Sequence, residues 1–299
     1  MNILVYDVGG TAIKYALMND AAEILEQGEK PTPPANTGTF EDFLAVVESI
    51  YHMYEDQIDG LAFSMPGRID IENGIIVTPG ALEYNEGRHF YDELKAFTDL
   101  PVIMANDGKC AALAEYRMGA LQGCDSGAVV VIGTGIGGGF IIDHKLWNGH
   151  NQFAGELSFP MEQPFGVWLG NAWGTNGATR PMTDAVAVRK GLERGSVNGK
   201  DVFRMIEEGD EEAYAELKKM CDYLGYIIFN IQCIVDPERV AIGGGISRQP
   251  LVRELIQKEL DRLFGSVPCA MPHTELVTCK FFNDANLIGA LCNWSDHYA

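Results

Sequence analysis

Positively charged residues are scarce in this sequence. Lys and Arg together number 22, against 42 Asp and Glu, so the formal net charge is −20 over 299 residues. Proteins that bind nucleic-acid phosphates or anionic membranes need clustered Lys and Arg. The composition therefore predicts no nucleic-acid partner and no membrane association.

Paired cysteines and long apolar runs are also missing. The 7 cysteines are scattered without a C-x-x-C pair, which is typical of reduced thiols rather than of a disulfide framework. No apolar stretch reaches the roughly 18 to 20 residues that a membrane-spanning helix needs. The first residues enter a strand directly, without a basic and apolar leader. We expect a cytoplasmic protein.

Two common nucleotide-binding motifs are absent or incomplete. The P-loop pattern GxxxxGK[ST] does not occur. Gly133, Gly135 and Gly138 match the spacing G-x-G-x-x-G, but that fingerprint requires a helix immediately afterwards. Here the β-like FIID follows, so we interpret residues 133–139 as a hairpin turn and exclude a Rossmann dehydrogenase.

The predicted elements occur in two series of similar order. Each series opens with hairpin strands around a glycine cluster and continues with alternating helices and strands. We predict strands at 2–7, 12–19, 22–29, 60–67, 101–105, 127–133, 139–146, 239–245 and 275–282, and helices at 39–57, 89–98, 178–194, 200–208, 211–235 and 248–264, with further helices beginning near 108 and 285. The pattern predicts a small N-terminal α/β lobe (1–106) and a larger one (107–284), with the final helix (about 285–299) packing back on the first lobe.

Glycine clusters occur at DVGGT (7–11), GTGIGGG (133–139) and GGGIS (243–247). Glycine allows positive φ and close approach of backbone N–H groups to an anion. Any one cluster is equally consistent with a tight turn. As a set, two glycine hairpins could hold a polyphosphate from both sides and the third could pass a flat ring, which favours the two-lobed, ribonuclease H-like ATPase fold of actin, hexokinase and Hsp70.

Longer motifs around these clusters resemble the ROK family of bacterial sugar kinases. They are DVGGTAIKYALM, MANDGKCAALAEYRMGAL, VVVIGTGIGGGFIIDHKLWNGHNQFAGELS and VAIGGGIS, in the order and rough spacing of that family. The resemblance implies an ATP- and Mg²⁺-dependent kinase that transfers the γ-phosphoryl group to a sugar hydroxyl, expected to be the 6-OH of a hexose or β-glucoside. It also implies a homodimer.

The resemblance assigns nucleotide-binding roles to residues in all three glycine clusters. Asp7 would face Mg²⁺ through water, and Gly9, Gly10 and Thr11 would turn beneath the γ-phosphate. Lys14 either adds positive charge there or is a solvated strand lysine. The remaining matches are Gly133, Thr134 and Gly135 for phosphate, and Gly243, Gly244 and Gly245 for adenosine.

The resemblance also assigns the sugar site. Asp107 matches the general base that accepts the proton of the sugar hydroxyl, and Asn106 and Glu156 match sugar ligands. Gly67 matches a turn beside the sugar. From the residues alone, Asp107 could instead be a helix cap, Asp7 a buried acid capping a turn, and Glu156 a surface residue.

Two departures from the family pattern concern zinc. The family motif GExGH is Gly155-Glu156-Leu157-Ser158-Phe159 here, so Phe159 replaces a histidine ligand. The cysteine finger that follows it in the family is also missing, because no cysteine lies between Cys124 and Cys221. We therefore expect no zinc site. Phe159, Phe165, Trp168 and Trp173 either pack in its place or form a platform for a second sugar or an aglycone.

The family also includes repressors that bind sugar and DNA. Those carry an N-terminal winged-helix extension, whereas the first strand here is expected to begin at residue 2, and the net charge of −20 disfavours DNA. The alternative that remains is a catalytically weak, sugar-sensing regulatory protein.

Overall fold

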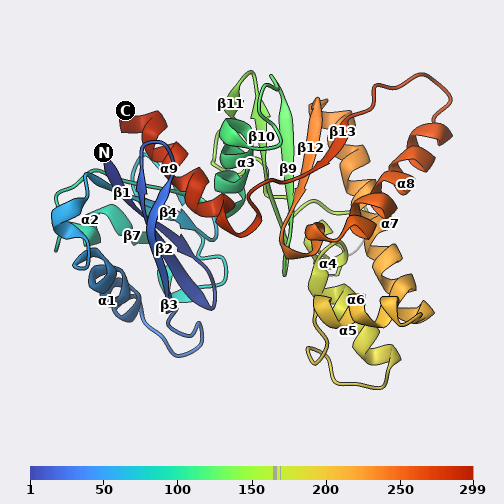
Figure 1. Cartoon of the computed structure of the whole chain (residues 1–299), viewed down its shortest axis with the longest axis horizontal. Coiled ribbons are helices and arrows are strands. Elements are labelled where there is room, and N and C mark those ends of the chain that lie inside the picture. Colours follow the sequence, from blue (N-terminus) through green and yellow to red (C-terminus); the bar gives the residue numbers. More distant parts are fainter. Residues whose placement is uncertain (164–166, 169, 299) are drawn as a thin grey trace. The chain divides into compact units, whose positions relative to one another are not determined.

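A computed structural model describes residues 1–163, 167–168 and 170–298 (Figure 1). The chain divides into two compact units. Unit 1 comprises Met1–Arg117, Leu146–Ala154 and Asp284–Ala299, and unit 2 comprises Met118–Lys145 and Gly155–Asn283. The sequence prediction began the second lobe at residue 107, whereas helix α3 (Asp107–Met118) belongs to unit 1 as far as Arg117.

Unit 1 is built on a five-stranded mixed sheet with the strand order β3-β2-β1-β4-β8. Strand β1 pairs antiparallel with β2, which pairs antiparallel with β3, whereas β1, β4 and β8 run parallel. The strands are β1 (Asn2–Val8), β2 (Ala12–Asn19), β3 (Ile24–Pro31), β4 (Gly60–Met65) and β8 (Val102–Asn106). Every residue of β4 is buried, as expected for a central strand between parallel neighbours.

The helices of unit 1 place apolar stripes on this sheet. Helix α1 (Phe40–Tyr51) begins with a capping box in which Thr39 and Asp42 exchange side-chain and backbone hydrogen bonds. It buries Phe43 and Val47 in the unit 1 core. Helix α9 (Ala285–Tyr298) packs against β1, β4 and β8. The remaining helices are α2 (Phe90–Leu94) and α3.

Unit 2 repeats the sheet design of unit 1. Its five strands follow the order β11-β10-β9-β12-β13, with β10 antiparallel to β9 and with β9, β12 and β13 parallel. The strands are β9 (Gly127–Ile132), β10 (Ile136–Ile142), β11 (Lys145–Leu146), β12 (Arg239–Gly243) and β13 (Glu275–Thr278). The helices are α4 (Trp173–Asn176), α5 (Thr179–Arg189), α6 (Gly199–Glu207), α7 (Glu211–Val235) and α8 (Pro250–Ser266).

The predicted elements form, with differences at their ends. The helix predicted at 39–57 ends at Tyr51, and a short 3₁₀ helix (Glu55–Gln57) follows. The strand predicted at 139–146 starts at Ile136 and is interrupted at Asp143 and His144, which both have positive φ. The small sheet of β5 (Ile69–Asp70), β6 (Ile75–Ile76) and β7 (Arg88–His89) was not predicted, because two-residue strands carry no periodicity.

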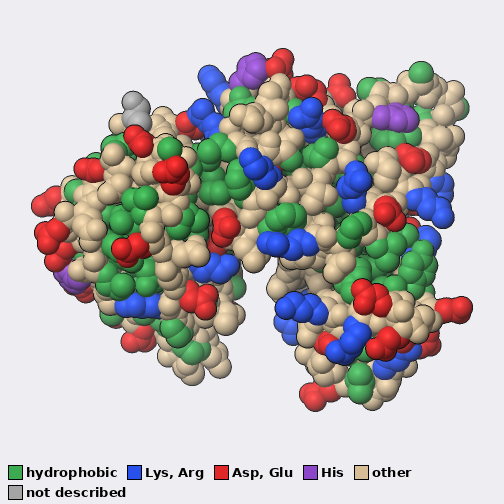
Figure 2. Space-filling view, viewed as in Figure 1, with side chains coloured by type: hydrophobic (Ala, Val, Ile, Leu, Met, Phe, Trp, Pro, Cys, Tyr) green, Lys and Arg blue, Asp and Glu red, His purple; other side chains and the backbone are tan. Residues whose placement is uncertain are grey.

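The surface carries charged side chains of both signs. On the face shown in Figure 2, Lys and Arg side chains are interspersed with Asp and Glu over both units. Within the described residues, no helix combines the length and the apolar character needed to cross a bilayer.

Candidate active site

Asp7 is a buried carboxylate near the end of β1. Its Oδ1 accepts hydrogen bonds from Ser64 Oγ at 3.1 Å and from Asn286 Nδ2 at 2.9 Å. Burial raises the pKa of Asp7, and the two hydrogen bonds and the charge of Lys14 partly offset that increase. Lys14 is the cross-strand partner of Asp7 on β2. The carboxylate is thus held in a defined orientation at a position where burial disfavours its charge.

The glycine hairpin after β1 is tied to the end of β3. Gly9 N donates to Ala12 O at 3.0 Å, which closes the turn around Gly10 and Thr11. Thr32 fastens both sides of the turn: its N–H donates to Thr11 O at 3.0 Å and its hydroxyl to Gly9 O at 2.7 Å. Hydrogen bonds from Gly9 and Thr32 therefore fix the shape of the turn.

Asn106 caps helix α3. Its Oδ1 accepts from Lys109 N at 3.2 Å, as an N-cap side chain does, and its Nδ2 donates to Gly67 O at 3.0 Å. Gly67 has a φ of 88°, and a Cβ there would lie 2.0 Å from Thr78 O, so only glycine fits this turn. Asn106 thus joins the start of α3 to the turn after β4.

Asp107 is the first residue of α3, and the capping role considered for it in the sequence belongs to Asn106. Asp107 Oδ1 accepts from the adjacent Gly108 N at 2.8 Å. The pKa of Asp107 is raised from its ordinary value of 3.8 to about 6, mainly by burial and further by the negative charge of Asp7, against the hydrogen bond from Gly108. Unit 1 therefore brings together two carboxylates whose charged forms are disfavoured, a common feature of functional sites.

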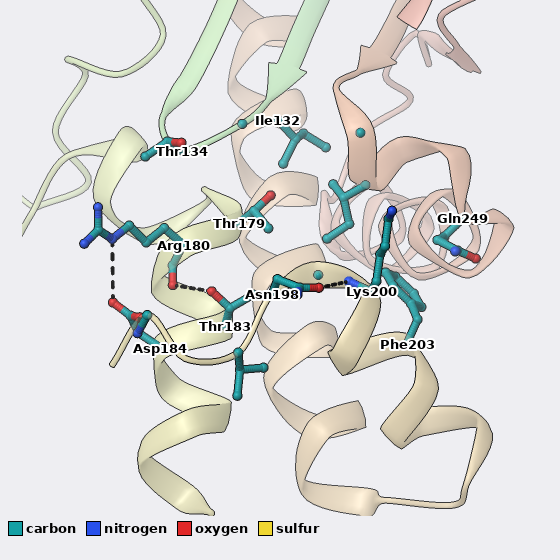
Figure 3. Close-up of a pocket in the computed structure, with 16 residues that line it drawn as sticks. Ile132, Thr134, Thr179, Arg180, Thr183, Asp184, Asn198, Lys200, Phe203 and Gln249 are labelled. Atoms are coloured by element: carbon teal, nitrogen blue, oxygen red, sulfur yellow. Dashed lines mark hydrogen bonds and ion pairs between the residues drawn. The ribbon is translucent and has the colours of Figure 1, made fainter. Parts of the chain in front are cut away.

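Unit 2 contains a pocket of about 830 Å³ (Figure 3). Its lining residues lie at the end of β9, at the start of α5, on and before α6, and where β12 passes into α8. Figure 3 shows Thr134 on one side, Lys200 and Gln249 on the other, and Thr179 between them. The lining residues are Ile132, Gly133, Thr134, Thr179, Arg180, Thr183, Asp184, Gly195, Val197, Asn198, Gly199, Lys200, Phe203, Gly245, Ile246 and Gln249.

The predicted nucleotide residues of unit 2 lie at or beside this pocket. Gly133 and Thr134 form the β9–β10 turn with Gly135, and Gly133 N donates to Gly135 O at 2.9 Å. Gly245 lines the pocket from the turn after β12. Gly243 and Gly244 precede it. Gly244 has a φ of 88°, and a Cβ there would lie 2.1 Å from Ile132 O, so this glycine allows the two turns to approach.

Glu156 lies in a turn of unit 2. Its carbonyl accepts from Phe159 N at 3.1 Å, and its side chain is half-buried between the buried Gly155 and Leu157. Ser158 in the same turn fixes the glycine hairpin, because its hydroxyl bonds both N and O of Ile136, at 3.1 and 2.9 Å. The Glu156 turn and the β9–β10 hairpin are therefore one connected structure within unit 2.

The aromatic residues near Glu156 separate into two groups. Trp173 is buried in the unit 2 core. Phe159 and Trp168 stack on each other at 5.4 Å between ring centroids, with 45% and 44% exposure, and Trp168 Nε1 donates to Phe159 O at 3.0 Å. Phe165 lies outside the described residues.

Metal ligands of the zinc type are not grouped in the described part of the chain. No set of at least three His, Cys, Asp or Glu side chains there could hold a metal ion. The absence of zinc from the purified protein remains a prediction.

Several residues that build these sites were not predicted from the sequence. Ser64, Thr32 and Asn286 act through contacts distant in sequence, as with the 279 positions between Asn286 and Asp7. A single sequence gives no signal for such partners. Ser158 could have been suspected, because it lies within the FAGELS motif.

The sheet order, the paired glycine hairpins and the carboxylates at the carboxyl ends of strands define the two-lobed ATPase fold of actin and hexokinase, as predicted. The ROK family model matches residues 4–297. The chain therefore belongs to the ROK family of sugar kinases, which confirms the resemblance seen in the motifs.

Named relatives align over nearly the whole chain. The chain is 30% identical over 300 residues to a beta-glucoside kinase of Klebsiella pneumoniae, covering 100% of this chain and 97% of that protein. It is 29% identical over 306 residues to a glucokinase of Halalkalibacterium halodurans, covering 95% and 92%. A ROK family protein from Streptococcus pneumoniae, solved in complex with sucrose, superposes with a TM-score of 0.88 at 30% identity and 99% coverage of both chains.

Proposed function

We propose that this ATP-dependent ROK sugar kinase transfers the γ-phosphoryl group of ATP to the 6-OH of a hexose or β-glucoside, with Asp107 as the general base. The observation that carries the proposal is the state of Asp107. It is half-buried, it is relieved of helix capping by Asn106, and its pKa is raised to about 6. A carboxylate of that pKa is deprotonated at neutral pH, yet accepts a proton more readily than an ordinary aspartate.

Asp7 fits the role of holding Mg²⁺ through water. Ser64 and Asn286 both donate to Oδ1, which orients the carboxylate, while burial makes its charge unfavourable until a cation is near. Mg²⁺ is a hard cation that prefers oxygen ligands and keeps several waters. When bound with ATP, it would neutralise charge on the transferring phosphoryl group.

The remaining polar groups of unit 1 would position the reactants. The Gly9–Thr11 turn offers backbone N–H groups to phosphate oxygens, and Lys14 supplies positive charge beside Asp7. Asn106 and Gly67 would hold the sugar hydroxyl near Asp107. Phosphoryl transfer requires little more of a protein than positioning and charge stabilisation.

The unit 2 pocket has the size and composition for adenosine. Ile132, Phe203 and Ile246 give it apolar surface, while Thr134 and the β9–β10 turn offer polar groups at one end. Pockets of about 300 to 1,000 Å³ with this mixture accommodate small ligands. We assign the base and ribose to this pocket and the phosphates to the Gly133–Gly135 turn, with Gly243–Gly245 alongside.

A β-glucoside acceptor is supported by the residues that follow Glu156. Glu156 would bind hydroxyls near the anomeric end of the sugar. Phe159 and Trp168 stack in the same loop region with both rings partly exposed, so they could contact a second sugar or an aglycone. A monosaccharide would make no use of this surface.

The test is a panel of acceptors assayed for ADP release with MgATP. Glucose, mannose, fructose, N-acetylmannosamine, cellobiose and gentiobiose separate monosaccharide from β-disaccharide kinases. We expect turnover of the β-disaccharides, with phosphate on the 6-OH by NMR. Binding of sugars without ADP release from any of them would instead support the sugar-sensing alternative.

A further inference from the structure

The segment Leu146–Ala154 belongs to unit 1, although the residues on both sides of it in sequence belong to unit 2. It begins with Leu146, the last residue of β11, and leads directly into Gly155 and Glu156. Gly149 and Gly155 have φ values of 70° and 82°, so a glycine in the left-handed region lies within the segment and another at its end. We therefore asked which contacts hold this segment on unit 1.

Two cations of unit 1 hold the segment by its backbone. Lys109 Nζ donates to Gln152 O at 2.6 Å, and Arg68 Nη1 donates to Asn151 O at 3.1 Å. Lys109 is only 2% exposed, and lysine is rarely buried so fully without a specific partner. It lies on the first turn of α3, the helix that Asp107 begins.

Local features of the segment disfavour its backbone conformation. Gln152 has a φ of 59°, an unfavourable value for a residue with a long side chain. Asn148 Oδ1 and Gln152 Oε1 are buried without a hydrogen-bond partner. Each of these features opposes the observed conformation, so the bonds from Lys109 and Arg68 are needed to maintain it.

We propose that Lys109 is a positioning residue for the sugar: by holding Gln152 it sets where the chain enters the Glu156 turn. This rests on the proposed function of Glu156. Lys109 itself need not touch the sugar.

Lys109→Met keeps the length of the side chain and removes the donor. A hydrogen bond from a charged group stabilises by about 1.5 to 3 kcal/mol, so we expect the KM for sugar to rise by roughly 10- to 100-fold. The KM for ATP and kcat should stay within about twofold, because the unit 2 pocket is unchanged. Hydrogen exchange should accelerate in a peptide covering 146–154.

Two further variants make the test specific. Arg68→Met removes the more exposed donor and should give the same pattern with a smaller effect, which also serves if Lys109→Met does not fold. Lys95→Met, at an exposed lysine paired with Asp92, is the control and should change nothing. An equal rise in the KM for sugar and the KM for ATP would overturn the positioning role. Unchanged hydrogen exchange in 146–154 would overturn the view that Lys109 and Arg68 hold this segment. Wild-type protein that is inactive on every sugar overturns the proposed function, while the exchange measurement still tests whether Lys109 and Arg68 hold the segment.

Discussion

The two units carry the same sheet order but different residues at the same turn. In unit 1 the hairpin between β1 and β2 closes with the pair Val8↔Ile13, preceded by Asp7↔Lys14. In unit 2 the hairpin between β9 and β10 closes with Ile132↔Ile136, and the preceding pair is Val131↔Gly137. A charged pair in one unit thus corresponds to an uncharged pair in the other.

The difference extends to the other strands. At the end of β8, unit 1 places Asn106 and then Asp107, whereas unit 2 has Thr278 and then Cys279 at the end of β13. The pocket lies beside the uncharged turn of unit 2 and is lined partly by helices α5 and α6. The shared fold therefore fixes where turns occur, whereas the side chains differ: under the proposed function, unit 1 supplies the base and the Mg²⁺ ligand, and unit 2 binds the adenosine.

The largest effect should follow from removing Mg²⁺. If Asp7 needs a cation because burial disfavours its charge, EDTA should abolish ADP release, and Mg²⁺ restored in excess should return it fully. Asp7→Asn should not recover activity at any Mg²⁺ concentration. Undiminished turnover in EDTA would contradict the role of Asp7 in holding Mg²⁺, and with it the functional difference proposed between the two units.

Asp107→Asn should lower kcat by about 10² to 10⁴ with sugar binding largely retained, because only proton acceptance is lost. The same change should stabilise the fold. The pKa of Asp107 rises from 3.8 to about 6 on folding, so the charged form destabilises the protein above that range, by up to about 3 kcal/mol at neutral pH. An Asp107→Asn variant with lower kcat and a higher Tm would identify Asp107 as the base.

Asp92→Asn, at an exposed residue paired with Lys95, is the matched control and should change neither quantity measurably. An Asp107→Asn variant that retains kcat would show that Asp107 has a structural role only.

The pH dependence should show the same residue. A base must be deprotonated, so kcat/KM should fall about tenfold per pH unit below a pKa near 6 and level off above it. The profile is measured at saturating Mg²⁺ with ADP release as readout. An acidic limb near pH 4, the range of an ordinary aspartate, would mean that the raised pKa of Asp107 does not govern the reaction.

Gly245→Val should weaken ATP binding and leave sugar binding unchanged. Gly245 lines the pocket, and a Cβ built there meets nothing within 4 Å, so the new side chain occupies pocket space without a clash in the fold. We expect the KM for ATP to rise at least about tenfold, equivalent to about 1.4 kcal/mol. Gly265→Val, where a Cβ also meets nothing within 4 Å, is the control outside the pocket. An equal change in the KM for ATP in both variants would contradict the assignment of the pocket to nucleotide binding.

The smallest effect should come from a zinc-selective chelator, which we expect to change neither activity nor Tm. Phe159 stands at the position of the family histidine, and no cysteine lies between Cys124 and Cys221. Elemental analysis of the purified protein should find no stoichiometric zinc. One tightly held zinc per chain would contradict the expectation, and with it the view that aromatic packing replaces a metal near Glu156.

Much of the fold could be predicted because hydrophobic periodicity and glycine turns are local. The series of strands and helices was predicted nearly complete, including the hairpin interpretation of Gly133–Gly138, which β10 confirms. The three-stranded sheet of β5, β6 and β7 was missed, since pairs such as Ile69↔Ile76 depend on contacts across a turn rather than on a pattern.

The candidate site was predicted less completely. Motif residues such as Asp7 and Asp107 were found, but the groups that set their environment were not. The sequence could not tell whether Asp107 caps α3, because Asn and Asp are both favoured caps and stand side by side; the hydrogen bond from Lys109 N to Asn106 decides it. Nor could it reveal that Lys109 is buried, because a lysine in a helix is ordinarily solvated.

Helix α9 has a consequence for how the protein is made. It packs on β1, β4 and β8, and its Asn286 holds Asp7, 279 positions earlier in the chain. During synthesis the first strands emerge long before their covering helix, so unit 1 keeps apolar sheet surface uncovered while the whole of unit 2 is translated. The earliest-made unit is thus the last to be completed, and we expect ribosome-bound chains lacking α9 to be the species that chaperones bind.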